Sequence, residues 1–203
     1  APGTNYSITV IHAAPYNYSI TPAVDTMTAG TNNSYTVTLY DVYGNTAPAP
    51  SDTIIYLNTT STGLNAQFNE AGTANQITYV TVEAGNSTAA FDYYDELAGT
   101  WTIQGNSSFL VNDSAQITVL PSVADTVQID PSVPKTISAD IASYSVTAWV
   151  NDTFGNPVSD GTQVDFTPTV GATATPGSDN TVNGVVTTTL DMLPLAGNQY
   201  NVT

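Results

Sequence analysis

The residues in this chain that could do chemistry are few, and most of them are carboxylates. Asp92, Asp95 and Glu96, in the sequence DYYDE, form its one compact acidic cluster. Two carboxylates that face each other across a cleft can cleave a glycoside, and grouped carboxylates can bind calcium. Because these three are adjacent in a predicted loop, we expect a solvated turn first, a calcium site second and catalysis last. Asp125 and Asp130, near the predicted domain junction, give a similarly weak reason to consider calcium.

The sequence lacks the usual partners of a nucleophile. It has one His (His12), one Lys, no Arg and no Cys. A catalytic Ser usually needs a paired base, and His12 has no second His or Arg to assist it. No Gly-rich phosphate loop or His/Cys metal spacing is present. We therefore expect no enzyme activity, no catalytic residue, no metal ligand that the motifs identify and no required cofactor.

Modification is the chemistry that the sequence supports best. The N-glycosylation sequon Asn-x-Ser/Thr, without proline in the middle, occurs nine times. Its asparagines are Asn5, Asn17, Asn32, Asn58, Asn86, Asn106, Asn112, Asn151 and Asn201. A chain this rich in Asn, Ser and Thr yields several sequons by chance, yet an exported chain would carry N-linked glycans at some of them. The best candidates are Asn86, Asn106, Asn112 and Asn151.

Composition excludes several classes of partner. The 203 residues carry a formal net charge of −16 at pH 7. Binding a nucleic-acid backbone requires a cluster of Lys and Arg, which this chain does not have. No stretch approaches the roughly eighteen apolar residues of a membrane helix, and the first residues lack the form of a signal peptide. We expect no nucleic-acid partner, an extracellular location at the cell surface, and membrane contact only through an anchor outside this chain.

The elements that position these residues are predicted to be β-strands. Short runs rich in Val, Ile, Thr and Tyr, such as SYTVTLY and GVVTTTL, alternate with clusters of Gly, Pro, Asn, Asp and Ser. No segment has a convincing apolar period of 3.6 residues. A strand about every eight to twelve residues is typical of a β-sandwich.

The chain repeats itself at an offset of 109 residues. Ten positions between 8 and 40 are identical to the residue 109 places further on. A two-residue insertion, Val150–Asn151, then aligns the Asp-x-x-Gly-Asn turns at Gly44 and Gly155, where we expect a positive φ. The repeat predicts an all-β protein with a terminal strand in 1–12, one sandwich in 13–121 and a second in 122–203.

The repeated strand also predicts which side chains are buried. Val146, Ala148 and Val150 share one face and should lie in the core, whereas Trp149 should point the other way. Tyr40 occupies the matching place in the first copy. Each aromatic ring either lies under a neighbouring loop or faces a partner domain or a glycan.

Four motifs in the second copy identify a family that it resembles. They are DTFGNPV (152–158), VDF (164–166), NGVVTTTL (183–190) and LAGNQYNVT (195–203). With them, residues 126–203 resemble the bacterial Ig-like domains of intimin and invasin type, which also occur in archaeal surface proteins; residues 16–120 match more loosely. The resemblance implies two tandem Ig-like β-sandwich domains that serve as a spacer, stalk or lattice unit at a cell surface.

The two ends of the chain suggest how such domains connect. The residues Tyr6, Ser7, Ile8, Thr9, Val10 and Ile11 correspond by the repeat to the last strand of the first domain, 115–120. Thr203 corresponds to Gly105, which precedes that strand. We therefore expect the second domain to lack its last strand within this chain. Residues 6–11 would complete a neighbouring domain, by donor-strand addition between subunits or as an adjacent repeat of one polypeptide.

The sequence thus favours a self-associating structural repeat of a microbial filament, sheath or S-layer. Its partners would be copies of itself or adjacent repeats. The alternative is the stalk or a carbohydrate-binding domain of a cell-surface adhesin, for which the Tyr93–Tyr94 pair is the only hint. An enzyme acting on glycosides is the third and least supported hypothesis.

Overall fold

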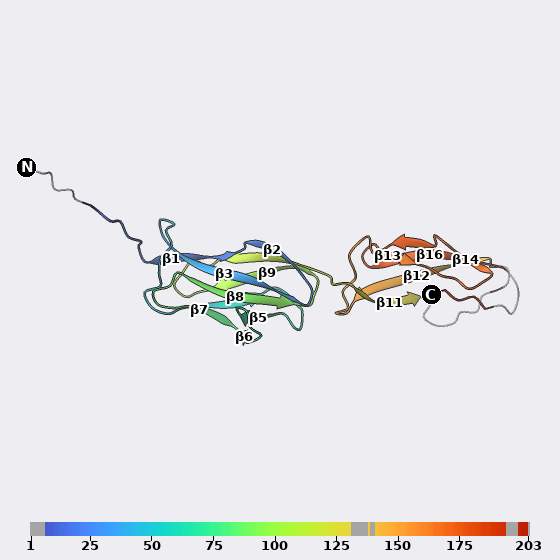
Figure 1. Ribbon diagram of the computed structural model, residues 1–203, viewed down its shortest axis with the longest axis horizontal. Coiled ribbons are helices and arrows are strands. Elements are labelled where there is room, and N and C mark those ends of the chain that lie inside the picture. Colours follow the sequence, from blue (N-terminus) through green and yellow to red (C-terminus); the bar gives the residue numbers. More distant parts are fainter. Residues whose placement is uncertain (1–6, 131–137, 139–140, 194–198, 203) are drawn as a thin grey trace, which may run out of the picture. The chain divides into compact units, whose positions relative to one another are not determined.

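The computed structural model describes residues 7–130, 138, 141–193 and 199–202. The regular elements within these residues are β-strands, and none is a helix, which confirms the predicted all-β class. Figure 1 shows the strands along the chain, which divides into two compact units, Ala1–Val119 (unit 1) and Leu120–Thr203 (unit 2). Nothing among the described residues is a helix long and apolar enough to cross a membrane.

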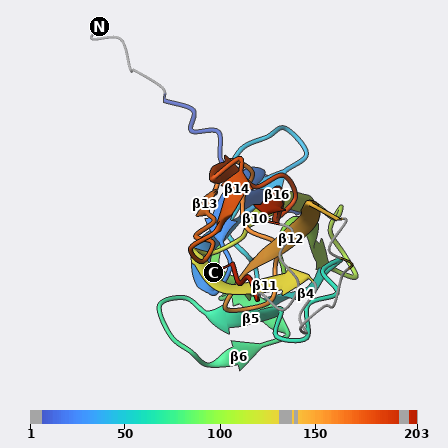
Figure 2. The ribbon, with the colours of Figure 1, turned by 90° about the vertical axis from the view of Figure 1, so that its right-hand side faces the viewer.

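The strands of unit 1 belong to two sheets. Their bounds are β1 (Pro15–Thr21), β2 (Val24–Thr28), β3 (Thr31–Asp41), β4 (Thr53–Thr59), β5 (Gln67–Glu70), β6 (Gln76–Ile77), β7 (Tyr79–Val82), β8 (Thr88–Asp95), β9 (Gly99–Asn106) and β10 (Ser114–Leu120). One sheet has the order β1-β3-β8-β5-β6 and the other β2-β10-β9-β4-β7. Figure 2 shows β5 and β6 side by side at the end of the first sheet.

The core of unit 1 lies between these sheets because alternate residues of each strand point inward. On β3, Tyr35, Val37 and Leu39 are fully buried, and β10 contributes Ile117 and Val119 from the other sheet. Burying one such side chain stabilises the fold by about 1.5–3 kcal/mol. Strand β10 is therefore an integral part of this core.

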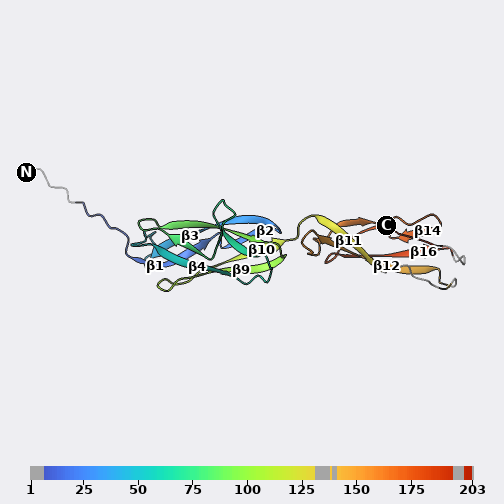
Figure 3. The same ribbon diagram turned by 90° about the horizontal axis from the view of Figure 1, so that it is seen from below.

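The described residues of unit 2 form one sheet that matches β1-β3-β8-β5 of unit 1, and a second sheet of two strands. Its strands are β11 (Ala124–Asp130), β12 (Ser143–Asp152), β13 (Gln163–Asp165), β14 (Ala172–Thr175), β15 (Ser178–Asn180) and β16 (Val185–Met192). One sheet has the order β11-β12-β16-β14, and Figure 3 labels its four strands. In the other sheet β13 pairs with β15. As predicted, Val146, Ala148 and Val150 are buried, and Trp149 on the opposite face is 37% exposed.

The hydrogen-bond register corrects one detail of the sequence repeat. Ile20 of β1 pairs with Val37, whereas its counterpart Ile129 of β11 pairs with Ala148. Each residue of β12 therefore lies 111 positions after its counterpart on β3, compared with 109 positions between β1 and β11. The two extra residues thus lie between β11 and β12 and not at Val150–Asn151. By the same register Trp149 corresponds to Thr38. The prediction that Tyr40 matches Trp149 is wrong, although both point away from the buried face.

Residues 7–12 have no strand partner among the described residues. In Figure 1 the described residues before β1 run away from the strands of unit 1. Residues 7–12 form no strand, and Ile8 and Val10 are 91% and 90% exposed. Tyr6 lies outside the described residues. The pairing of 6–11 with a neighbouring domain stays a prediction.

Candidate assembly site

Each unit has a turn whose Asp side chain organises the backbone around it. Asp41 Oδ1 accepts the N–H groups of Tyr43 and Asn45, each at 2.9 Å. Asp152 Oδ1 accepts those of Phe154 and Asn156 at 2.9 and 2.8 Å. Local donors of this kind explain why Asp precedes the Gly-Asn pair in both turns.

The second oxygen of each carboxylate binds the segment that enters the unit. Asp41 Oδ2 accepts the N–H of Ala13, and Asp152 Oδ2 accepts the N–H of Ser122, both at 2.8 Å. Ala13 and Ser122 are 109 residues apart, as the repeat requires. The residue that leads into each unit is therefore held by the same hydrogen bond in both units.

These hydrogen bonds favour the ionised carboxylates. The Ala13 N–H, helped by the Asn45 side chain, lowers the pKa of Asp41 to about 2 although burial opposes this. Burial raises the pKa of Asp152, but hydrogen bonds from Asn156, Ser122 and Phe154 outweigh it, and the pKa is lowered. The two acids therefore stay charged at any ordinary pH and hold the entering segments in place.

Among the described residues of unit 2, no strand occupies the place that β10 fills in unit 1. Strand β9 pairs with β4, and the Thr60 N–H donates to the Thr102 carbonyl at 3.0 Å. In unit 2 the Thr169 N–H donates in the same way to the Asn201 carbonyl at 2.9 Å. The end of the described chain thus begins the equivalent of β9. None of the residues described in unit 2 forms a strand beyond it, where β10 would lie.

Side chains beneath this place are exposed in unit 2 and buried in unit 1. Tyr18 is 3% exposed, whereas its counterpart Val127 is 57% exposed. Ile20 is buried and Ile129 only half-buried. In unit 1, Gly105 of β9 covers this pair so closely that a Cβ there would lie 2.7 Å from the Tyr18 hydroxyl. In unit 1 this contact comes from the end of β9, and Thr203, which corresponds to Gly105, lies outside the described residues.

The acidic cluster is not the solvated turn that the sequence predicted. Asp92 and Asp95 lie on β8 and are buried. The Ser34 hydroxyl and the Gly72 N–H donate to Asp92 at 2.6 and 2.7 Å. The Tyr93 hydroxyl and the Leu97 N–H donate to Asp95 at 2.7 and 2.9 Å. These carboxylates satisfy buried donors, and such contacts act on the fold.

The third acid of the cluster, Glu96, is half-buried and engaged as well. It accepts the Tyr94 hydroxyl and the Asn65 side-chain amide, both at 2.6 Å. The hydrogen bond to Glu96 is the largest of the effects that raise the pKa of Tyr94 to about 12.

The calcium hypotheses gain no support from the described residues. These contain no group of three or more His, Cys, Asp or Glu side chains arranged to hold a metal ion. Asp125 and Asp130 are both exposed on β11. His12 is exposed and bonds through Nδ1 to the neighbouring Ala13 carbonyl.

Most of the predicted glycosylation sites are accessible, and their occupancy stays a prediction. Asn5 lies outside the described residues. Six asparagines are exposed: Asn32, Asn58, Asn86, Asn106, Asn112 and Asn201. Asn17 and Asn151, both on strands, are half-buried, and the Oδ1 atom of Asn17 is buried without a hydrogen-bond partner.

The aromatic pair that hinted at sugar binding is not exposed. Tyr93 is fully buried, and its hydroxyl contacts both Asp95 and Thr59. Tyr94 is half-buried. Exposed rings lie elsewhere and include Tyr56, Tyr79 and Phe109 on unit 1, which are 54%, 47% and 94% exposed.

Comparison with known proteins identifies the fold. No protein-family model and no curated protein matches the sequence. The chain is similar to the structure of the Escherichia coli adhesin FdeC, with 19% identity, a TM-score of 0.50, and coverage of 94% of this chain and 60% of that one. It also matches the Yersinia pseudotuberculosis adhesin InvE (16%, TM-score 0.38, 88% and 51%) and domains 5–6 of the S-layer protein SbsC (16%, TM-score 0.38, 95% and 91%).

These similarities concern the fold. The chain spans less than two thirds of the FdeC structure that it matches. Its structural neighbours include Ig-like domains of adhesins and domains of S-layer proteins. The predicted Ig-like β-sandwich of the intimin and invasin type is confirmed.

Proposed function

We propose that this chain is a structural repeat of a microbial extracellular surface assembly, without catalytic activity, whose units join by strand complementation. Residues 6–11 of one repeat occupy the open place beside the β9 equivalent in unit 2 of another. The repeats are either separate chains or successive parts of one polypeptide. The proposal rests above all on two hydrogen bonds: Asp41 holds Ala13, which follows residues 6–11, as Asp152 holds Ser122, which follows β10.

Residues 7–11 have the chemistry that the open place requires. Ile8 and Val10 correspond to Ile117 and Val119, which point into the core of unit 1. Ser7 and Thr9 would face outward, as the alternation of a strand demands. Burying the two apolar side chains would contribute about 3–6 kcal/mol before the cost of ordering the segment.

The linker supports the same register. The Ala13 N–H is held by Asp41 as the Ser122 N–H is held by Asp152, so residues 6–11 precede this bond in the chain by the same number of residues as β10 does. A location at the cell surface is part of the proposal and fits a fold that adhesin and S-layer domains also use.

Electron microscopy of the native material tests the assembly. We expect filaments or lattices with a regular axial repeat. Denaturing electrophoresis then distinguishes the two sources of the strand, because separate subunits give chains with a single two-unit repeat and a continuous polypeptide gives a much longer chain that contains many.

Matched variants test the strand itself. Ile8→Asp with Val10→Asp places charges on the inward face and should abolish assembly, since buried unpaired charges are costly. Thr9→Asp with Ile11→Asp adds the same charge to the outward face, keeps the Asn5 sequon and should leave assembly intact. Equal assembly of both variants, or a wild-type chain that stays monomeric at every concentration, would refute strand complementation.

The stalk or carbohydrate-binding domain of an adhesin is the alternative. The Ig-like fold suits that role equally well. Monodisperse wild-type monomers that retain a sugar on a glycan array would support it.

A further inference from the structure

Three exposed side chains form a row across the outer face of unit 1. Tyr56 on β4 is the cross-strand partner of Asn106 on β9 and of Tyr79 on β7. Directly paired residues point to the same side of a sheet, about 4.5–5.5 Å apart at their Cβ atoms. Asn106, Tyr56 and Tyr79 therefore follow one another on one surface.

The two rings are exposed in a way that a folded unit alone does not explain. Tyr56 and Tyr79 meet edge to face, with ring centroids 6.1 Å apart, yet they are 54% and 47% exposed. Neither hydroxyl has a hydrogen-bond partner among the described residues. Neighbouring aromatic rings that are open to solvent are typical of surfaces that bind something.

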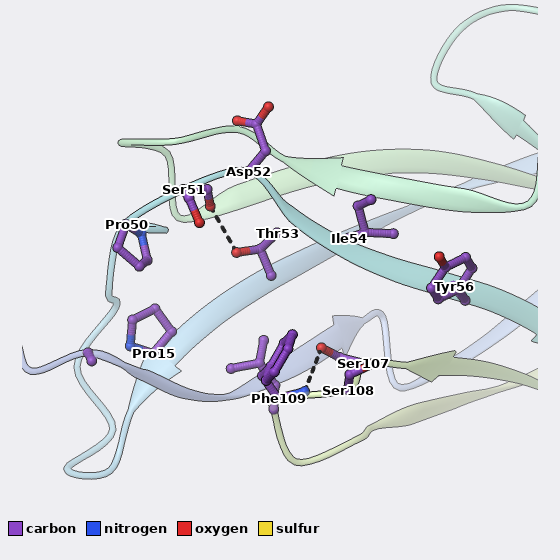
Figure 4. A pocket seen from close by; sticks show the side chains of 12 residues that line it. Pro15, Pro50, Ser51, Asp52, Thr53, Ile54, Tyr56, Ser107, Ser108 and Phe109 are labelled. Carbon is purple, nitrogen blue, oxygen red and sulfur yellow. Dashed lines mark hydrogen bonds between the residues drawn. The ribbon is translucent and has the colours of Figure 1, made fainter.

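A hollow beside the row enlarges this surface. Figure 4 shows Tyr56 on its strand and Phe109 on the loop after β9, which both line the hollow. Ser107 and Ser108 also line it, and they complete the Asn106 sequon. The modification signal and the exposed rings thus belong to the same place.

The chemistry of the row selects its occupant. Sugar rings carry faces of C–H groups that pack on aromatic rings, while their hydroxyls stay in water. The surface holds no Lys or Arg that would recruit an anionic ligand. A glycan on Asn106 would begin at the residue directly across from Tyr56 on the neighbouring strand. It would therefore reach the Tyr56 ring without any separate binding step.

We propose that Asn106 carries an N-linked glycan whose first sugars pack on Tyr56 and Tyr79, and that this contact stabilises unit 1. The Asn106 Nδ2 atom, to which the glycan attaches, donates no hydrogen bond among the described residues. This inference does not depend on how the chain assembles.

Glycopeptide mass spectrometry of the native protein should find Asn106 occupied. The full chain is then produced in a glycosylating host as wild type, Asn106→Gln, Tyr56→Thr and the double variant. Threonine removes the ring and keeps a strong preference for strands. We expect Asn106→Gln to lower the Tm of unit 1 by about 2–6 °C in the wild type, and by less than half as much in the Tyr56→Thr background.

Two controls separate a sugar contact from a general effect of glycosylation. Asn86→Gln removes a sequon in a turn and should shift the Tm equally in both backgrounds. Tyr56→Phe keeps the ring and should restore the full effect of Asn106→Gln. Sugar proton resonances shifted upfield by ring currents would be direct support. An unoccupied Asn106, or equal effects of Asn106→Gln with and without the Tyr56 ring, would overturn the proposal.

Discussion

At the scale of single residues, the carboxylates of this protein act mainly as hydrogen-bond acceptors for its own backbone and hydroxyl groups. Asp41 and Asp152 each bind a turn and an entering linker. Asp92 and Asp95 are buried on a strand with donors of their own. Buried acceptors of this kind are costly to remove because the donors lose their partners.

Asp41 should make the stability of unit 1 depend on pH in the acid range. Its pKa is about 2 in the fold, compared with about 3.9 in an unfolded chain. The contribution of Asp41 to the free energy of unfolding should therefore be fully present above about pH 4 and should be lost as the pH falls toward 2. Asp41→Asn should lower stability at pH 7 and make the acid decline shallower, as measured by urea unfolding from pH 2 to 7.

The exposed Asp125 supplies a charge-matched control for this variant. Asp125→Asn changes the net charge equally and should leave both stability at pH 7 and the acid decline close to wild type. If Asp41→Asn retained the wild-type decline between pH 4 and 2, its carboxylate would not carry the effect.

The burial of Asp92 could not be predicted from the sequence for a physical reason. Its donors, Ser34 and Gly72, lie 58 and 20 residues away and meet it only after the sheet has formed. In the sequence, DYYDE simply resembles an acidic loop. The contacts of Asp41 and Asp152 within their turns are closer to the sequence, because the N–H donors to each Oδ1 atom lie two and four residues later.

At the scale of elements, glycines in tight turns fix the strands of both units. Gly44 and Gly155 have φ of +84°, as predicted, and no heavy atom lies within 4 Å of a Cβ built on either. Gly184 has φ of +71°, and its Cβ would lie 2.7 Å from Pro157 Cβ and 2.9 Å from the Val150 carbonyl oxygen. The first two positions require a backbone conformation, and the third also requires the absence of a side chain.

Alanine at these positions should separate the two costs. Gly155→Ala should destabilise unit 2 by about 1 kcal/mol through backbone strain. Gly184→Ala should cost clearly more, because the added Cβ also overlaps Pro157 and the Val150 backbone. Chemical unfolding followed by Trp149 fluorescence would measure both, and equal losses would contradict the close approach.

The strands and turns of the repeat could be predicted from the sequence, apart from the position of the two-residue insertion. The inward residues of β12 and the positive φ of both turn glycines follow from alternation and turn chemistry. The position of the two-residue insertion did not, because the matching Ser-Tyr pairs at 34–35 and 143–144 favoured an ungapped alignment. Only the hydrogen-bond register places the extra residues before β12.

At the scale of the whole molecule, the two units have unequal cores. The described core of unit 1 extends over both sheets and includes Ile117 and Val119 of β10. The described core cluster of unit 2 contains Ala148, Phe166 and Val186, with Val164 only half-buried where Ile55 is fully buried. Unit 2 should therefore be the less stable part of an isolated chain.

Calorimetry of the isolated chain should show two transitions, with unit 2 unfolding first. A peptide with the sequence of residues 6–11 should raise the temperature of the lower transition only. At a peptide concentration of one hundred times its Kd, the free energy of unfolding of unit 2 should rise by up to about 2.7 kcal/mol. The same peptide carrying Ile8→Asp and Val10→Asp should have no effect. A shift of the upper transition instead would place the strand on unit 1 and contradict the proposed register.

The linker hydrogen bond has a consequence for how such a protein can evolve. Asp41 and Asp152 bind the backbone N–H of Ala13 and Ser122, and neither bond uses the side chain of the linker residue. Any residue except proline can supply that donor. Gene segments that encode whole repeats can therefore be duplicated or exchanged without a matching change in the linker residue, and the length of the array becomes free to vary.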